Sequence, residues 1–87
     1  MKGTKYMTIS MTENQIVEIE YNYRCAINIL NDCNAEIYIS AKNDFTESLK
    51  IPSRCSYNGF MSKFDGNNNI YIKSVGIGDV SVGVEMI

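Results

Sequence analysis

VEIEYNYRCAINI, residues 17–29, is the stretch that decides the fold, because apolar and polar residues alternate along it. The odd positions carry Val, Ile, Tyr or Cys, and the even positions carry Glu, Asn, Arg or Ala. A period of two directs successive side chains to opposite faces of a β-strand, so one set faces a core and the other faces water. The alternation runs over residues 15–30. At about 3.3 Å per residue this is too long for one strand of a small domain. It therefore predicts two strands, with a bend or tight turn at residues 22–24.

Short segments of similar character fill the rest of the chain. Strands are predicted at residues 5–11, 36–40, 49–51, 70–73 and 80–86, and turns at residues 12–14, 31–34, 43–44 and 65–69. Gly76 and Gly78 predict a hairpin loop, Pro52 predicts the end of a strand or a sheet edge, and residues 53–64 follow neither period.

The fold class follows from the number and spacing of these strands. Seven to eight short strands predict one all-β domain over residues 1–87. We expect an antiparallel β-sandwich of jelly-roll or immunoglobulin-like type, with a small β-barrel as the alternative. Residues 1–14 are predicted either to belong to this sandwich or to form an N-terminal arm or exchanged strand.

Composition argues against several classes of partner. The net charge is −2, and the two signs are scattered along the chain. Nucleic-acid binding requires a basic face, and attraction to anionic lipid requires basic clusters, so neither partner is expected. The first residues are not followed by an apolar run, and no segment approaches the roughly 18 apolar residues of a membrane span. We therefore expect no signal peptide, no membrane segment and synthesis in a cytoplasm.

Few residues are suited to catalysis or metal binding. The chain has no His, which is the usual base for a Ser or Cys nucleophile. Its ten acidic residues fall mostly on outward strand positions or in turns, where solvated surface charge is the expected role. Cys25 has the register of a small buried residue, whereas Cys33 and Cys55 lie in polar sequence and are expected to be free thiols in loops. No enzyme activity, cofactor or metal is therefore expected.

Two tyrosines occupy matching places in similar strands. Tyr38 and Tyr71 each stand at the centre of an Ile-Tyr-Ile triplet, so both point outward if the isoleucines point inward. Three roles remain open for them. They could form a cross-strand pair that covers the sheet, contact a neighbouring subunit, or stack on a ligand such as a sugar ring.

Residues 28–86 carry a resemblance to a known class of proteins. AEIYIS at residues 35–40 is followed by LKIP at 49–52, by NIYIKS at 69–74, and then by the Gly76–Gly78 loop and DVSV at 79–82. This order resembles the small β-sandwich accessory proteins encoded among the virion genes of tailed bacteriophages. The resemblance implies a non-enzymatic structural subunit, such as a capsid decoration protein or a head or tail accessory subunit, located in the virion.

The resemblance also implies partners. These are further copies of the chain and a major capsid protein or another virion protein. The residues expected to make such contacts are Tyr38, Tyr57, Phe60, Phe64 and Tyr71. The alternative function is a carbohydrate-binding β-sandwich module, in which exposed tyrosines would act beside polar groups such as Asn58 or residues 67–69.

Overall fold

The structure is a computed structural model of the chain, and it describes residues 4–20, 25–61 and 69–86. The described residues form eight strands. The strands are β1 (Thr4–Met11), β2 (Ile16–Glu20), β3 (Cys25–Cys33), β4 (Ile37–Ser40), β5 (Leu49–Ile51), β6 (Ser56–Met61), β7 (Asn69–Ser74) and β8 (Gly78–Met86).

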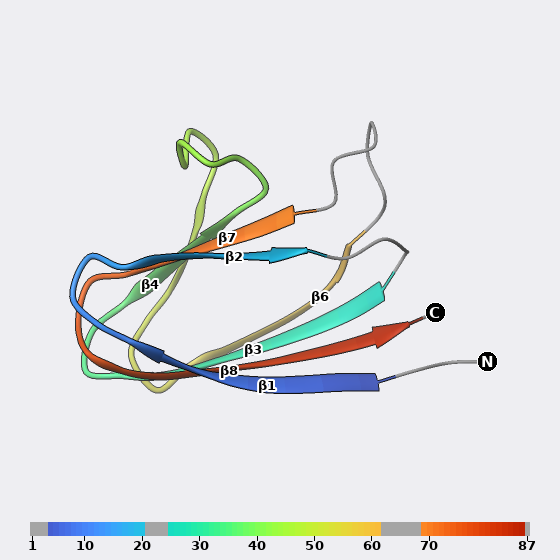
Figure 1. Cartoon of the computed structure of the whole chain (residues 1–87), viewed down its shortest axis with the longest axis horizontal. Helices are drawn as coiled ribbons and strands as arrows, with labels where there is room; N and C mark the ends of the chain where they lie inside the picture. The colour runs from blue at the N-terminus through green and yellow to red at the C-terminus, as the bar shows by residue number, and fades with distance from the viewer. Residues whose placement is uncertain (1–3, 21–24, 62–68, 87) are drawn as a thin grey trace.

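The strands form two four-stranded antiparallel sheets that pack face to face (Figure 1). The first sheet has the order β1-β8-β3-β6 and the second has the order β2-β7-β4-β5. Consecutive strands alternate between the sheets, except for the neighbours β4 and β5. This is the strand order of a jelly roll, built from two Greek keys. The predicted antiparallel β-sandwich is confirmed, and the strand order selects the jelly roll over the immunoglobulin-like arrangement.

Inward side chains from both sheets form the core between them. The stretch at residues 17–29 does divide into two strands, β2 and β3, although its predicted bend at residues 22–24 lies outside the described residues. Ile19 of β2 and Ile27 and Ile29 of β3 face each other from opposite sheets and are at most 6% exposed. The buried apolar residues are Met11, Ile19, Ile27, Ile29, Cys33, Ile37, Ile51, Ile70, Ile72, Val80, Val82 and Val84.

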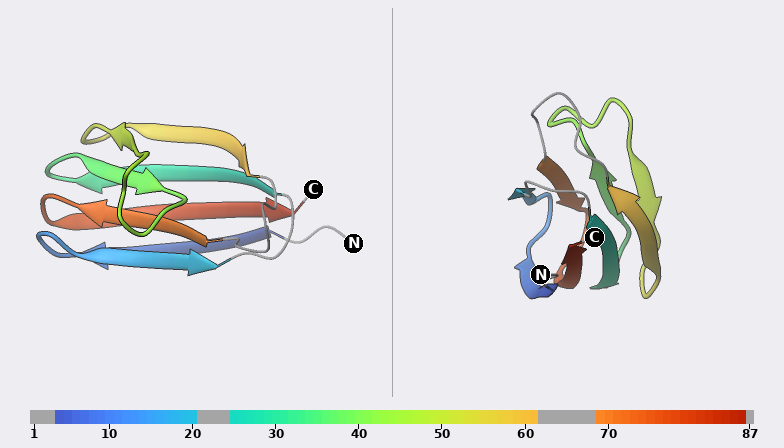
Figure 2. Two further views of the ribbon diagram at one scale, coloured as in Figure 1. Left: turned by 90° about the horizontal axis from the view of Figure 1, so that it is seen from above. Right: turned by 90° about the vertical axis from the view of Figure 1, so that its right-hand side faces the viewer.

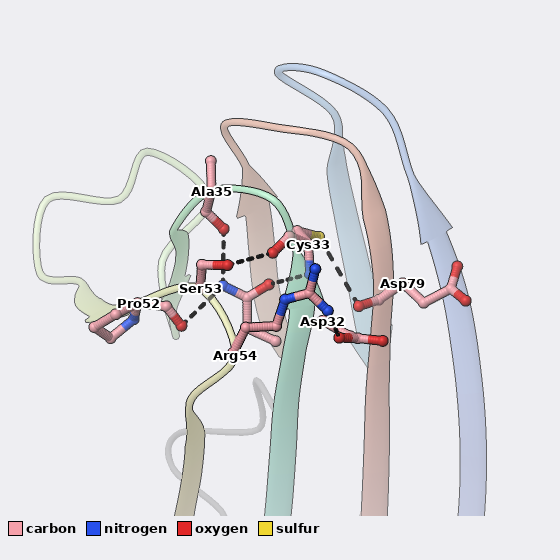
Figure 3. A network of polar contacts seen from close by, with 8 residues as sticks. Asp32, Cys33, Ala35, Pro52, Ser53, Arg54 and Asp79 are labelled. Carbon is pink, nitrogen blue, oxygen red and sulfur yellow. Dashed lines mark hydrogen bonds and ion pairs between the residues drawn. The ribbon is translucent and has the colours of Figure 1, made fainter.

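The turn predicted at residues 31–34 is wrong, because β3 continues through Cys33. Asn31 is fully buried, and its amide Nδ2 donates to the carbonyl oxygens of Ala35 at 2.9 Å and Pro52 at 3.1 Å (Figure 3). The same Nδ2 also donates to the carbonyl oxygen of Ile51 at 3.0 Å. Its Oδ1 accepts from the backbone N–H of Cys33 at 2.9 Å. A buried polar side chain is tolerated when its hydrogen bonds are satisfied, and here they are. Cys33 is likewise buried at the end of the strand and not in a loop.

The glycine loop before β8 also differs from its prediction. It joins β7 of the second sheet to β8 of the first, so it is a crossing between sheets and not a hairpin within one. Gly78 has a φ of 149°, and a Cβ there would lie 2.5 Å from the Cα of Cys33. Only glycine fits this close approach of the two backbones.

The turn predicted at residues 65–69 lies outside the described residues except for Asn69, which begins β7. Several other predicted boundaries hold. β5 ends at Ile51, directly before Pro52, and it is an edge strand of the second sheet. The ambiguous residues 53–64 contain a loop and then β6. Within residues 1–14, β1 pairs with β8 of its own chain over its whole length. That this segment acts as an arm or an exchanged strand in an assembly stays a prediction.

Candidate interaction surfaces

The outer face of the second sheet carries the two matching tyrosines. Tyr38 lies opposite Lys73 in the β4–β7 register, and Tyr71 lies opposite Ser40, so the tyrosines are diagonal neighbours. Both are half-buried, and the Tyr38 hydroxyl donates to Glu36 Oε2 at 3.5 Å. Charged residues lie beside both tyrosines, because Lys50 and Lys73 are opposite Tyr38 and Glu18 is opposite Tyr71.

Two of the other predicted contact residues, Tyr57 and Phe60, belong to a strand of the first sheet. Tyr57 of β6 belongs to the first sheet, is half-buried and packs against the core. Phe60 is the fifth residue of β6, and its side chain is not among those that the structure describes. Phe64 lies outside the described residues. Asn58 is exposed on β6, so it cannot join Tyr38 and Tyr71 in one sugar site.

The outer face of the first sheet holds an apolar hollow that the sequence reasoning missed. Tyr6 is 80% exposed, and its ring extends over Gly83, where a Cβ would meet the ring carbon Cε1 at 2.9 Å. With Leu30, which is 45% exposed, and Asn28, it borders a hollow of about 300 Å³. Ser56 of β6 and Ser81 of β8 also line the hollow, as does Thr8 of β1. The sequence could have indicated that Tyr6 points outward, because Tyr6 and Thr8 are both even-numbered residues of β1 and therefore lie on the same face.

Charge distinguishes the two outer faces. At the outward positions of the described strands, the first sheet carries neither Lys nor Arg, whereas the second sheet carries Lys50 and Lys73 as well as Glu18. The acidic residues at outward positions of the first sheet lie near the ends of its strands. Asp32 and Asp79 are opposite each other in the β3–β8 register. Asp79 accepts a hydrogen bond from Ser10, and Arg54 forms an ion pair with Asp32 (Figure 3).

The four free edges of the sheets also differ. β1 and β6 are the edges of the first sheet, and β2 and β5 are the edges of the second. β5 has three residues and is followed by Pro52, β2 alternates with Glu, and β6 contains Gly59. Each of these features discourages the addition of a further strand. β1 has eight residues, an unbroken register with β8, and Lys5 as its only charged residue.

An apolar pocket of about 300 Å³ lies between the sheets, beside the β4–β5 loop. Its walls include Ile39 and Leu49 from the second sheet and Tyr57 from the first. Leu49 is 45% exposed although it lies opposite Ile39 on the inward register, so the core is open at this side. The lining suits an apolar group.

Cys33 and Cys55 lie in different environments. Burial raises the pKa of the Cys33 thiol, and the nearby carboxylates of Asp79 and Asp32 raise this pKa further. A thiol with a raised pKa is a poor nucleophile because little thiolate forms. Cys55 is exposed in the β5–β6 loop. The part of the chain that the structure describes contains no cluster of three or more His, Cys, Asp or Glu residues that could hold a metal ion.

Comparisons of the chain with protein-family models, with curated proteins and with solved structures give no match. Within the described residues, no helix has the length and apolar character needed to cross a membrane.

Proposed function

We propose that this protein is a non-enzymatic structural subunit of a tailed-bacteriophage virion, a capsid decoration protein or a head or tail accessory subunit that acts through protein–protein contacts. Two features support this. Residues 28–86 resemble such proteins in the order of their strand motifs. The strand order is that of the jelly roll, an architecture that viral capsid domains use.

The observation that carries the proposal is the outer face of the first sheet together with its β1 edge. The centre of a protein interface is depleted of charge and enriched in aromatic residues, and its backbone groups are paired. This face has Tyr6 at 80% exposure beside Leu30, no outward Lys or Arg on its described strands, and a long unprotected edge. Such a surface suits burial against protein better than permanent contact with water.

The mechanism is additive. One copy of this small domain buries a modest area, and the many copies on a particle multiply the effect of each contact. The half-buried pair of Tyr38 and Tyr71 on the opposite outer face is proposed as a second, weaker contact, because charged neighbours surround it.

The direct test is to look for the chain in particles. Mass spectrometry of purified virions from the source should detect it at a fixed ratio to the major capsid protein. Purified protein should sediment with particles that lack it, and this binding should saturate. Tyr6→Ala should weaken binding by about tenfold or more, as expected for loss of an interface aromatic. The double variant Tyr38→Ala, Tyr71→Ala should weaken it less, and both variants should remain folded. Absence of the chain from particles, together with no cosedimentation, would refute the proposal.

The second candidate function is carbohydrate binding, and the hollow beside Tyr6 is the observation that favours it. An exposed aromatic ring next to the amide of Asn28 and the hydroxyls of Ser56 and Ser81 offers the stacking and hydrogen-bonding groups that a sugar requires. A glycan screen should then show saturable binding that is lost in Tyr6→Ala and kept in Tyr71→Ala. A screen without any saturable ligand removes this candidate.

A further inference from the structure

We propose that the chain forms a symmetric dimer in which β1 pairs antiparallel with β1 of a second copy, so that the two first sheets become one continuous sheet of eight strands. This inference rests on the proposed function, because it names the partner of the β1 edge. β1 and β2 lie along the same long side of the sandwich, and β1 is an edge strand of its sheet (Figure 2).

The occupant follows from the chemistry of the edge. An unprotected edge strand presents a row of unpaired N–H and C=O groups that another strand can satisfy. Residues 6–11 of β1 carry no charge, and Met7 is 36% exposed although it lies on the inward register. Residues 6–11 of a second copy carry no charge either, so the pairing of two copies needs no oppositely charged partner. β2, with Glu18 and Glu20, would bring like charges together.

Symmetry and side-chain direction then limit the possible registers to those centred on one residue of β1. Residues directly opposite each other in an antiparallel pair share a face, so outward residues of one copy must oppose outward residues of the other. The twofold axis must therefore lie midway between one residue of β1 and the same residue of the second copy. Centring it on Thr8 places Tyr6 opposite Ser10 and Met7 opposite Ile9, and leaves Lys5 at the end of the pair, opposite Met11. Thr–Thr cross-strand pairs are favourable, and Lys5 does not meet its own copy.

Light scattering during size-exclusion chromatography gives the first readout. The wild-type protein should have twice the 9.8 kDa mass of the chain. Thr8 is exposed, so a charge at this position leaves the core unchanged. Thr8→Lys and Thr8→Glu should each be monomeric, because two like charges would stand opposite each other, and a mixture of the two variants should recover the dimer. Asn58→Lys adds the same charge to the opposite edge of the same sheet and should remain dimeric.

A cysteine at the axis gives the second readout. In a background with Cys25→Ser and Cys55→Ser, Thr8→Cys should form a covalent dimer on oxidation, since opposed Cα atoms lie about 4.5–5.5 Å apart. Ser10→Cys should not, because its copy would lie about 13 Å away along the strand. A wild-type monomer at every concentration tested, or a dimer that survives Thr8→Lys and is not crosslinked by Thr8→Cys, would overturn the pairing. In the second case the proposed function stands, because the chain still self-associates through another surface. Binding to particles by a wild-type monomer likewise separates failure of the pairing from failure of the proposed function.

Discussion

Replacing Asn31 by Ala should destabilise the fold more than any other single polar-to-Ala change on the first sheet. The two amide hydrogens of Asn31 serve three carbonyl oxygens, those of Ala35, Ile51 and Pro52, and its Oδ1 accepts from Cys33 N–H. Each buried group left without a partner costs about 1–3 kcal/mol, so losing several in Asn31→Ala should cost about 3–5 kcal/mol. A domain of 87 residues has a free energy of unfolding of about 4–13 kcal/mol. The change therefore removes a large part of the total stability.

Urea unfolding followed by far-UV circular dichroism measures this cost, with tyrosine fluorescence as a second probe because the chain has no Trp. Asn28→Ala is the matched control, since Asn28 is exposed three residues earlier on the same strand, and it should change stability by less than about 0.5 kcal/mol. Asn31→Asp should also destabilise, because a carboxylate would face three carbonyl oxygens without hydrogens to donate. If Asn31→Ala lowers the free energy of unfolding by less than about 1 kcal/mol, the buried hydrogen bonds of this side chain do not stabilise the fold as argued.

Three further outcomes are expected. Ile29 is fully buried, so Ile29→Ala should lower the free energy of unfolding by about 2–5 kcal/mol. Leu30, the next residue, is 45% exposed, so Leu30→Ala should lower it by less than about 0.5 kcal/mol. Urea titrations of both variants would measure these changes. Because burial raises the pKa of Cys33, a thiol reagent at pH 8 should modify exposed Cys55 rapidly and Cys33 only upon unfolding, which mass spectrometry of labelled peptides would reveal. The apparent free energy of unfolding of the wild-type dimer should rise by about 1.4 kcal/mol for each tenfold increase in protein concentration, so its urea midpoint should rise as well, and the midpoint of Thr8→Lys should not change.

The sequence predicts the two-layer β fold well, because strand periodicity is a local property. Ile27 and Ile29 could be assigned to the core from the alternation of residues 17–29, since a period of two fixes which face each side chain takes. The same local reasoning fails at Asn31. Its composition favours a turn, but its hydrogen-bond partners Ile51 and Pro52 lie about twenty residues further along the chain. Only the packing of the β5–β6 loop against β3 allows a polar strand end to be buried there.

The candidate surface was harder to predict than the fold. The outward direction of Tyr6 follows from the alternation of β1, but its importance depends on strand order. Gly83 lies beneath the ring only because β1 pairs with β8, and β1 is exposed only because it ends the sheet. The β1–β8 pairing joins segments from opposite ends of the chain. Tyr38 and Tyr71 illustrate the converse, since a repeated motif identified them while their charged surroundings came from β2 and β5.

The β1 pairing also explains how a chain with an unprotected edge could avoid open-ended aggregation. An uncharged edge strand can recruit copies without limit when each addition presents a new edge of the same kind. A twofold pairing is isologous, so it consumes both copies of β1 and leaves β6 at the two ends of the joined sheet. β6 contains Gly59, which weakens a strand and makes it a poor template. In the proposed dimer, growth therefore stops at two copies, and the outer faces of both sheets remain free on each subunit for the proposed contact with a larger partner.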